Sequence, residues 1–397
     1  MSERVIVALS GGVDSAVAAL LLKRAGHELE ALHMTNWQED EAGYCTAAAD
    51  WQDARRIAAE LDIPIHHVSF AAEYRERVFK HFLADYAAGL TPNPDILCNR
   101  EVKFGACLNY MRRLGGSELA TGHYARIARF EGRPGLCRAR DADKDQSYFL
   151  QQMPRAALGQ VRFPLGELVK GEVRELARAA GLPVHDRPDS TGICFIGERP
   201  FRAFLETYLR AQPGPIETPA GERLGTHDGL MYHTIGQRQG LKIGGLAHHA
   251  ARPWYVAGKD LARNALIVVQ EQDHPLLLSD AFEVEQVHWL NSADQTWEES
   301  QSIECAVKTR YRQNDLDCTV QLTREPRAPG APSGAGDPIW RVILDQPARA
   351  VTPGQYAVFY RDALCLGGGV IARRFNSCMP YIGRGITYNS QFSVEGS

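Results

Sequence analysis

Near the start of the chain, two glycines and two serines have the types and spacing of a phosphate-binding loop. They belong to the run Ala8-Leu9-Ser10-Gly11-Gly12-Val13-Asp14-Ser15, which stands between a predicted strand and a predicted helix. There, backbone amides and the hydroxyls of Ser10 and Ser15 converge at a helix N-terminus, where the helix dipole favours an anion. The glycines permit positive φ and close approach of a ligand. The run predicts a phosphate site whose positive charge comes from the backbone.

The run matches neither of the two commonest nucleotide-binding loops. No lysine follows the glycines, so the Walker pattern is absent, and the GxGxxG spacing is absent as well. An isolated pair of glycines is more often only a tight strand-to-helix turn. The letters SGGVDS, however, resemble the PP-loop of ATP pyrophosphatases, enzymes that release pyrophosphate while they transfer AMP to a substrate oxygen. That resemblance implies ATP as the nucleotide.

A carboxylate and a thiol stand close together farther along the chain. Asp95 and Cys98 follow two prolines just before a helical pattern, so a helix that begins there puts both on one face. A neighbouring carboxylate raises a thiol pKa, which suits Asp95 to moving protons rather than to stabilising a thiolate. Arg100 and Lys103 could favour the thiolate.

A second reactive thiol is predicted at Cys194. It lies in a glycine-flanked loop with Arg199 and Arg202 nearby, and Pro200 is placed to open a helix. A mobile, electropositive loop is where a reactive thiol is expected. A cysteine inside a cell is more often a small buried hydrophobe, and we assign the other seven cysteines to that class. Cys98 and Cys194 are far apart in sequence, so only the fold can unite them.

The elements that must position these residues change character along the chain. From Val5 to about Phe204, short apolar runs alternate with amphipathic stretches, which is typical of a parallel α/β sheet. Strands are expected over 5–9, 29–34 and 65–69, and helices over 15–24, 47–61, 71–88 and 101–114. After about Pro213 the short β-rich runs broken by Gly and Pro predict antiparallel structure. Arg324–Asp337 is predicted to be a mobile loop.

Composition excludes several classes of protein. The 397 residues include 44 Lys+Arg and 48 Asp+Glu, and the net charge of −4 argues against an indiscriminate polybasic binder of nucleic acid. No apolar run is long enough for a membrane helix, and no signal peptide is expected. The nine cysteines contain no CxxC pair, so neither a zinc ribbon nor a disulfide scaffold is predicted. We expect a cytoplasmic protein with no metal site of its own.

Three motifs occur in order along one chain: SGGVDS, TPNPDILCN over 91–99 and STGICFIGERPF over 190–201. Together they resemble the bacterial tRNA-specific 2-thiouridylases, and the likeness runs from about Arg4 to Arg373. It implies a PP-loop α/β domain over 1–212 and a small central β domain over 213–278. A C-terminal antiparallel β-barrel is implied over 279–380, followed by a tail over 381–397.

The resemblance also implies a reaction. ATP, expected as Mg-ATP, binds at Ala8 to Ser15 with Met34 and Gly122 beside it, and the enzyme adenylates the C2 oxygen of wobble uridine 34. Cys194 then carries a persulfide, Cys98 is the nucleophile that pairs with it, and Asp95 is the general acid and base. The products are 2-thiouridine, AMP, pyrophosphate and a transient Cys98–Cys194 disulfide.

The implied partners are tRNAs, expected to be the Lys, Glu and Gln acceptors, and a sulfur-relay protein fed by a cysteine desulfurase. No membrane is implied. The tRNA contacts carried over from the family are Asn93, Pro94, Asp95, His123, Lys144, Asp145, Gln146, Arg310, Tyr311 and Gln355. Without the family match, the residues support another interpretation equally well: His123 is a histidine with its hydrogen bonds satisfied inside the protein, and the basic run 308–312 is a solvent-exposed strand face.

Two other functions remain open from the sequence. The first is a PP-loop ATP pyrophosphatase that acts on a small molecule, which leaves the motifs around Cys98 and Cys194 unexplained. The second is a non-catalytic RNA-binding scaffold whose loop only senses ATP. A requirement for the thiol in turnover, tested with Cys194→Ser, separates the first from the thiolation reaction. Pyrophosphate release that depends on added tRNA eliminates the second.

Overall fold

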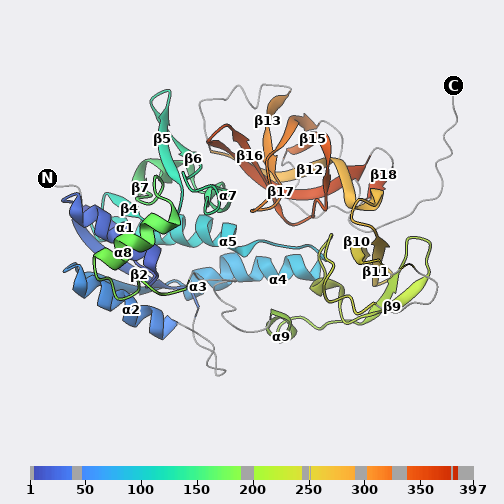
Figure 1. Ribbon diagram of the computed structural model, residues 1–397, viewed down its shortest axis with the longest axis horizontal. Helices are drawn as coiled ribbons and strands as arrows, with labels where there is room; N and C mark the ends of the chain where they lie inside the picture. The colour runs from blue at the N-terminus through green and yellow to red at the C-terminus, as the bar shows by residue number, and fades with distance from the viewer. Residues whose placement is uncertain are drawn as a thin grey trace.

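The computed structural model describes residues 4–37, 47–188, 201–243, 250, 252–290, 302–323, 338–376 and 379–382, the last range by its backbone only. Within these ranges the chain forms an α/β domain, a small central β domain and a β-barrel (Figure 1). The sequence predicted this fold class, and the structure confirms it. No helix in the described ranges is long and apolar enough to cross a membrane.

The first domain is built on a sheet whose strand pairings are all parallel. Its strand order is β3 (Ile65–Ser69), β2 (Glu28–Thr35), β1 (Arg4–Ala8), β4 (Glu118–Ala120) and β7 (Val161–Arg162). The chain moves outward in one direction from β1 to β3 and in the other to β4 and β7, so the strand order reverses beside β1. In such sheets ligands bind outside the carboxyl ends of the strands at the point of reversal. The loop after β1 occupies that point.

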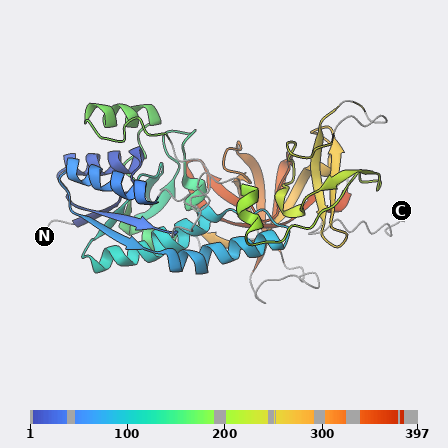
Figure 2. The same ribbon diagram turned by 90° about the horizontal axis from the view of Figure 1, so that it is seen from below.

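Three helices pack against apolar residues of this sheet: α1 (Val13–Arg24), α2 (Ala47–Glu60) and α8 (Lys170–Ala179). A further helix, made of α3 (Ala71–Tyr74), η1 (Arg75–Phe79) and α4 (Lys80–Ala87), covers the range expected as helix. Figure 2 shows, as Figure 1 does, that this helix extends from the sheet toward the central domain.

The helix that carries Cys98 begins earlier than predicted. It is formed by α5 (Pro94–Leu97), η2 (Cys98–Cys107) and α6 (Leu108–Arg113), whereas the apolar pattern predicted a start at Glu101. Pro94 fits the first turn because proline lacks the amide hydrogen that would be unpaired there. Asn93 caps this end, since its side chain accepts a hydrogen bond from the backbone of Asp95. The segment η2 is π-helical.

A β-hairpin in the first domain was not predicted. It consists of β5 (Arg126–Phe130) and β6 (Arg133–Cys137), and β6 pairs with a strand of the barrel through Cys137 and Leu364. The backbone amide of Arg138 also donates to the carbonyl of Ala363 at 2.9 Å. The first domain and the barrel therefore share a continuous sheet. Two short helices follow the hairpin, α7 (Ser147–Leu150) and η3 (Arg155–Gln160).

The central domain follows α9 (Phe201–Glu206) and has a four-stranded sheet. Its order is β10 (Trp254–Asp260), β11 (Ala265–Gln270), β8 (Gly214–Glu217) and β9 (Arg223–His227), with η4 (Leu230–Tyr232) after β9. Two of its pairings are antiparallel, as expected, but β8 and β11 pair in parallel. A small apolar core that includes Ile216, Val256 and Val268 holds the sheet together.

The C-terminal strands close into an antiparallel barrel. After η5 (Pro275–Leu277), the barrel order is β12 (Leu278–Trp289), β15 (Ile339–Arg349), β14 (Leu316–Thr323), β13 (Ile303–Lys308), β16 (Tyr356–Arg361) and β17 (Leu364–Asn376). The barrel is closed because β17 also pairs with β12, which leaves neither strand with a free edge. A short strand, β18 (Met379–Ile382), pairs with β17. The predicted tail otherwise lies outside the described residues.

One arginine joins the barrel to the central domain. Arg374 on β17 is only 1% exposed, and its guanidinium donates to the carbonyls of Ala257 at 2.7 Å and Leu276 at 3.0 Å. Burial lowers the pKa of this arginine to about 10.

We expect Arg374→Met to lower the free energy of unfolding by about 2–3 kcal/mol, because the substitution removes two buried hydrogen bonds that a charged group donates to backbone carbonyls. Urea unfolding of the full chain measures this change. The matched control is Arg178→Met on the exposed side of α8, which should change stability by less than about 0.5 kcal/mol. Equal stability of the two variants would contradict the structural role of Arg374.

Candidate functional site

The phosphate loop, residues 8–15, gathers hydroxyls and amides at the first turn of α1. The Oγ atoms of Ser10 and Ser15 lie 3.1 Å apart, and the amide of Ser10 donates to Ser15 Oγ at 3.2 Å. Gly11 has a φ of +89°, and a Cβ there would lie 2.5 Å from the carbonyl oxygen of Asp50. The loop can take this shape only with glycine at position 11.

A lysine that the sequence analysis missed reaches the loop from α8. The ammonium of Lys170 donates to both carboxylate oxygens of Asp14, at 2.7 and 2.9 Å, and the hydroxyl of Tyr124 donates to the same carboxylate at 2.9 Å. The positive charge at the loop therefore does not come from the backbone alone, which corrects the expectation above. No local pattern indicates Lys170, because it enters the site only through the packing of α8 on α1.

The sequence analysis also missed a second cation at the loop. Arg187 donates to the carbonyl of Gly11 at 3.0 Å and to the carboxylate of Asp53 at 2.8 Å, and it also pairs with Asp50. Both carboxylates belong to α2. Both Lys170 and Arg187 thus contact the loop, and each of these cations is positioned by carboxylates.

The two residues predicted to line the nucleotide site lie near this loop. Gly122 packs on the start of α1 so closely that a Cβ would lie 2.6 Å from the backbone nitrogen of Ser15. Met34 is half-buried near the carboxyl end of β2, the strand beside β1. Their contacts with nucleotide stay a prediction.

Asp95 and Cys98 share the first turns of their helix, as predicted. Cys98 is only 3% exposed, and the side-chain nitrogen of Asn36 lies 3.9 Å from its sulfur. Burial raises the pKa of Asp95 above its ordinary value, although the nearby charge of Lys103 opposes this effect. A raised pKa makes a carboxylate a stronger base once it is ionised.

Two other domains hold the segment that leads into this helix. The side-chain amide of Gln355 in the barrel donates to the carbonyl of Thr91 at 2.7 Å. The ammonium of Lys259 in the central domain donates to the carbonyl of Gly89 at 2.9 Å, and burial lowers the pKa of this lysine to about 8. Gln355 was predicted to contact tRNA. In the structure its side-chain amide binds this segment of the protein, and a tRNA contact stays a prediction.

His123 lies between two polar partners. Thr121 Oγ1 is 2.7 Å from its Nδ1, and the ammonium of Lys103 is 3.4 Å from its Nε2. Because an ammonium can only donate, Nε2 accepts and the ring proton resides on Nδ1. Burial and Lys103 lower the pKa of His123 well below its ordinary value, so the ring is neutral at pH 7.

The segment 141–146 is tied to the phosphate loop by two routes. The side chain of Gln146 accepts from the backbone of Tyr124, whose hydroxyl binds Asp14. Asp141 accepts from the backbone of Lys170, whose ammonium also binds Asp14. These contacts form a ring, which we call the Asp14 ring: Asp14, Tyr124, Gln146, the segment back to Asp141, and Lys170.

Two other residues that were predicted to contact tRNA also belong to this segment. The carboxylate of Asp145 is buried and accepts from the backbone amides of Ala139 and Ser147 and from the hydroxyl of Ser147. Lys144 is half-buried, and its backbone amide donates to Asp141. The hydrogen bonds of Asp145 thus stabilise the conformation of its own segment. Contacts of Asp145 and Lys144 with RNA stay predictions.

Arg310 and Tyr311 lie at the joint of the barrel with its neighbours. One guanidinium nitrogen of Arg310 donates to the carbonyls of Ile235 and Ala350, both at 2.9 Å, and burial lowers the pKa of this arginine. The ring of Tyr311 lies 4.5 Å from that of Phe149. Both residues join protein segments in the structure, and their binding of tRNA stays a prediction.

Cys194 lies outside the described residues, so its distance from Cys98 stays untested. The described residue Arg187 before it binds the phosphate loop, and the ring of Phe201 after it lies 5.6 Å from that of Tyr86 on α4. The assignment of the other cysteines to the interior is confirmed for the buried ones, which are Cys107, Cys137, Cys318 and Cys365. Cys305 is half-buried, and Cys45 and Cys378 lie outside the described residues.

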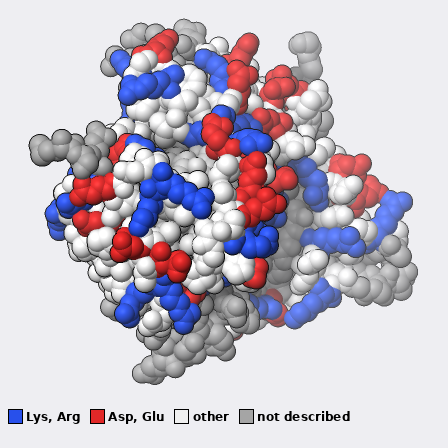
Figure 3. All heavy atoms as spheres, turned by 60° about the vertical axis from the view of Figure 1, so that its left-hand side comes forward, with Lys and Arg blue, Asp and Glu red and all other residues white. Residues whose placement is uncertain are grey.

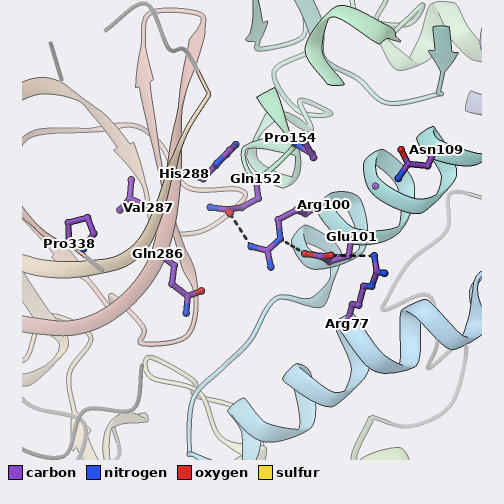
Figure 4. Close-up of a pocket in the computed structure, with 11 residues that line it drawn as sticks. Arg77, Arg100, Glu101, Asn109, Gln152, Pro154, Gln286, Val287, His288 and Pro338 are labelled. Atoms are coloured by element: carbon purple, nitrogen blue, oxygen red, sulfur yellow. Dashed lines mark hydrogen bonds and ion pairs between the residues drawn. The ribbon is translucent and has the colours of Figure 1, made fainter. Parts of the chain in front are cut away.

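A cleft of about 570 Å³ lies between η2 and the barrel (Figure 4). Arg100 donates to Glu101 at 2.8 Å and to Gln152 at 3.3 Å, and Arg77 lies 3.9 Å from Glu101. His288 on β12 bonds to the carbonyl of Met153 at 2.9 Å. These polar side chains are paired with one another or with backbone, and the bond between His288 and Met153 joins the barrel to the first domain.

Acidic and basic side chains are interspersed on the face of the first domain seen in Figure 3. That face carries no continuous basic surface in the described residues, in agreement with the overall charge of −4. Binding of RNA there would depend on local contacts.

Comparison with known families gives three successive matches. The model described as "tRNA methyl transferase HUP domain" matches residues 3–198. The "tRNA methyl transferase PRC-barrel domain" matches 202–270, and the "Aminomethyltransferase beta-barrel domain" matches 279–371. The three matches follow the three structural units in order.

Curated proteins match the chain over nearly its full length. The tRNA-specific 2-thiouridylase MnmA of Methylococcus capsulatus is 51% identical over 378 residues, which are 95% of this chain and 98% of the relative. The protein of the same name from Hahella chejuensis is 52% identical and covers 94% and 98%. That of Pseudomonas paraeruginosa is 51% identical and covers 93% and 94%.

We expect Gly11→Ala to weaken ATP binding by roughly tenfold or more, because a Cβ at this position would clash with the backbone of Asp50. Isothermal titration calorimetry of the full chain with ATP measures the change in affinity. Gly26→Ala is the matched control, since Gly26 also has a positive φ of +81° but open space around it. An equal loss in both variants would mean that backbone strain, and not the loop contact, is responsible.

The raised pKa of Asp95 predicts how stability depends on pH. The carboxyl group of Asp95 binds its proton more tightly in the folded state than in the unfolded state, where its pKa has the ordinary value of 3.8. The free energy of unfolding therefore falls as the pH rises from 3.8 through the raised pKa of the folded state. We expect Asp95→Asn to be more stable than the wild type at neutral pH, with the difference vanishing near pH 4. Urea unfolding across this range tests it, and a variant less stable at neutral pH would contradict it.

Proposed function

We propose that this chain, which belongs to the family of tRNA-specific 2-thiouridylases, is an ATP-dependent sulfurtransferase that replaces the C2 oxygen of wobble uridine 34 in tRNA with sulfur. One observation carries the proposal: Cys98 lies at the carboxyl edge of the sheet that holds the phosphate loop. Asn36, which follows β2, contacts Cys98, and His123, which follows β4, contacts Lys103 on the same helix. The helix therefore crosses the ends of the strands beside the loop.

In the first half of the proposed reaction, the uracil O2 attacks the α-phosphorus of ATP, bound with Mg²⁺, and pyrophosphate leaves. The backbone and hydroxyls of residues 8–15 hold the phosphates, with Lys170 and Arg187 nearby to balance their charge. The ring loses its N3 proton when O2 bonds to phosphorus, and Asp95 is the base that accepts it. The burial that raises the pKa of Asp95 supports this role.

In the second half, the terminal sulfur of a Cys194 persulfide attacks C2 and AMP leaves. The Cys98 thiolate then attacks the Cys194 sulfur, so that the S–S bond breaks, the outer sulfur remains on C2 and a Cys98–Cys194 disulfide forms. An external thiol reduces it. Cys194 lies outside the described residues, and the motif around it supports its role. A persulfide is a softer and better nucleophile than water, which a buried site excludes.

The substrates in this proposal are tRNAs for Lys, Glu and Gln, bound in the cytoplasm, and the sulfur comes from a relay protein fed by a cysteine desulfurase. Uridine 34 must leave the anticodon stack to reach Cys98, which single-stranded RNA permits. Asn93, Pro94 and Asp95 are proposed to meet the base. Their place at the start of the helix, next to Cys98, supports this contact.

Two alternatives make different demands on the site. Two matched models are described by methyl transfer to tRNA, which would use neither the phosphate loop nor Cys98 beside Asp95. A PP-loop enzyme for a small molecule would release pyrophosphate without tRNA. Release that requires both ATP and tRNA, followed by thiolated product, excludes both.

We expect Cys98→Ser to form no thiolated tRNA from ATP, tRNA and a persulfide source, as seen by retardation in a mercury gel. The variant should still release pyrophosphate, because Cys98 acts only after adenylation. Cys107→Ser is the matched control on the same helix, since burial raises the pKa of Cys107 to about 12 and keeps it a neutral thiol. Thiolated product from Cys98→Ser at the wild-type level would refute the proposed role of Cys98.

A further inference from the structure

Two cysteines of the barrel face each other across neighbouring strands. Cys305 on β13 is directly opposite Cys318 on β14 in the antiparallel register, and their sulfurs lie 3.8 Å apart. Cys318 is only 4% exposed, whereas Cys305 is half-buried. Both are free thiols in the structure. The reaction proposed above uses neither of them, so their pairing needs an explanation of its own.

The strand register places the two residues within the range of a disulfide bond. Residues directly opposite in an antiparallel pair have Cα atoms about 4.5–5.5 Å apart and side chains on the same face of the sheet. Disulfides join residues whose Cα atoms are roughly 4.4–6.8 Å apart. The two sulfurs can therefore approach each other by rotation of their side chains, while the strands stay paired.

The two thiols differ in how they can react. The hydrogen bond to Cys305 raises the pKa of the Cys318 thiol, and burial raises it further. Cys318 therefore keeps its proton and donates it toward the sulfur of Cys305. Solvent reaches part of Cys305 but almost none of Cys318. A reagent from solution is therefore expected to meet Cys305 first.

We propose that Cys305 and Cys318 form a reversible redox pair whose substrates are small disulfides such as oxidised glutathione. The Cys305 thiolate attacks one sulfur of oxidised glutathione, so that its S–S bond breaks and one glutathione leaves. Cys318 then gives its proton to water and attacks the Cys305 sulfur, which forms the Cys305–Cys318 bond and releases the second glutathione. The two cysteines lose two electrons and two protons, and oxidised glutathione takes up both. An excess of reduced glutathione reverses the exchange.

The new bond fastens the ends of one hairpin. The turn between β13 and β14 carries Arg310, which binds carbonyls of two other segments, and Asp315, which pairs with Arg138 of the first domain. A link across the hairpin closes this turn into a loop and restricts the unfolded chain. Disulfides of proteins inside cells are usually transient and redox-sensing. Oxidation therefore stabilises, reversibly, a hairpin that joins three parts of the molecule.

The test treats the reduced full chain with oxidised glutathione, blocks the remaining thiols and maps the cysteines by mass spectrometry after trypsin digestion. Trypsin cuts between the two cysteines, and the peptides that carry them, 264–308 and 313–324, contain no other cysteine. We expect these two peptides to be recovered as one linked pair, and dithiothreitol to separate them. Peptides that stay unlinked, or a mixed disulfide on Cys305 that never passes to Cys318, would overturn the proposal.

Two variants isolate the two halves of the exchange. Cys318→Ser is expected to stop at the mixed disulfide between Cys305 and glutathione. In Cys305→Ser, the buried Cys318 is expected to react with oxidised glutathione roughly tenfold or more slowly than Cys305 does in Cys318→Ser. Equal rates in the two variants would contradict the assignment of Cys305 as the attacking thiol.

Thermal unfolding tests whether the bond fastens the hairpin. We expect the oxidised wild type to unfold roughly 3–6 °C above its reduced form, because the link restricts the unfolded chain. Cys305→Ser keeps every other cysteine, so the same treatment of this variant measures the effect of any other link, and we expect no rise. An equal midpoint for the linked and the reduced wild type would refute the stabilising role.

Discussion

The candidate site depends on how the start of one helix is held against the edge of a parallel sheet. The helix that begins at Pro94 carries Asp95 and Cys98, and the segment before it is gripped by Gln355 of the barrel and Lys259 of the central domain. A carboxylate and a thiol on one short turn move together when that turn moves. All three domains therefore contribute to placing these two side chains: the backbone of α4 binds the amides of Gly89 and Leu90, while the barrel and the central domain bind the carbonyls of Thr91 and Gly89.

The second requirement is electrostatic. Polyphosphate carries several negative charges, and the loop that would receive it lies next to the carboxylates Asp14, Asp50 and Asp53. Each of them is paired with Lys170 or Arg187, so that most of their negative charge is offset at the loop. Charges arranged before the ligand arrives need little rearrangement during the reaction, and their effect is strongest where water is excluded. These ion pairs therefore hold the side chains of Lys170 and Arg187 in place beside the loop.

Short sequence patterns predicted the parts of the structure that depend on residues close together in the chain. The glycines of SGGVDS and the alternation of strands and helices indicated the loop and the parallel sheet, and the family likeness supplied the closed barrel. The helix begins before the predicted start at Glu101, because Pro92 and Pro94 pointed to a loop. Two signals favour the earlier start: Asn93 can cap the helix, and Pro94 fits its first turn. Lys170, Arg187 and the hairpin β5–β6 were missed because their partners come from distant segments. The domain limits at 212 and 278 stay a prediction.

The Asp14 ring has a thermodynamic consequence. It joins the carboxylate at the phosphate loop to the segment 141–146 through Tyr124 on one side and Lys170 on the other. Any ligand that tightens one part of such a ring lowers the entropy that remains to be lost when another ligand engages the opposite part. Linkage makes any such effect reciprocal: if a molecule that orders residues 141–146 favours binding at residues 8–15, the reverse holds by the same factor.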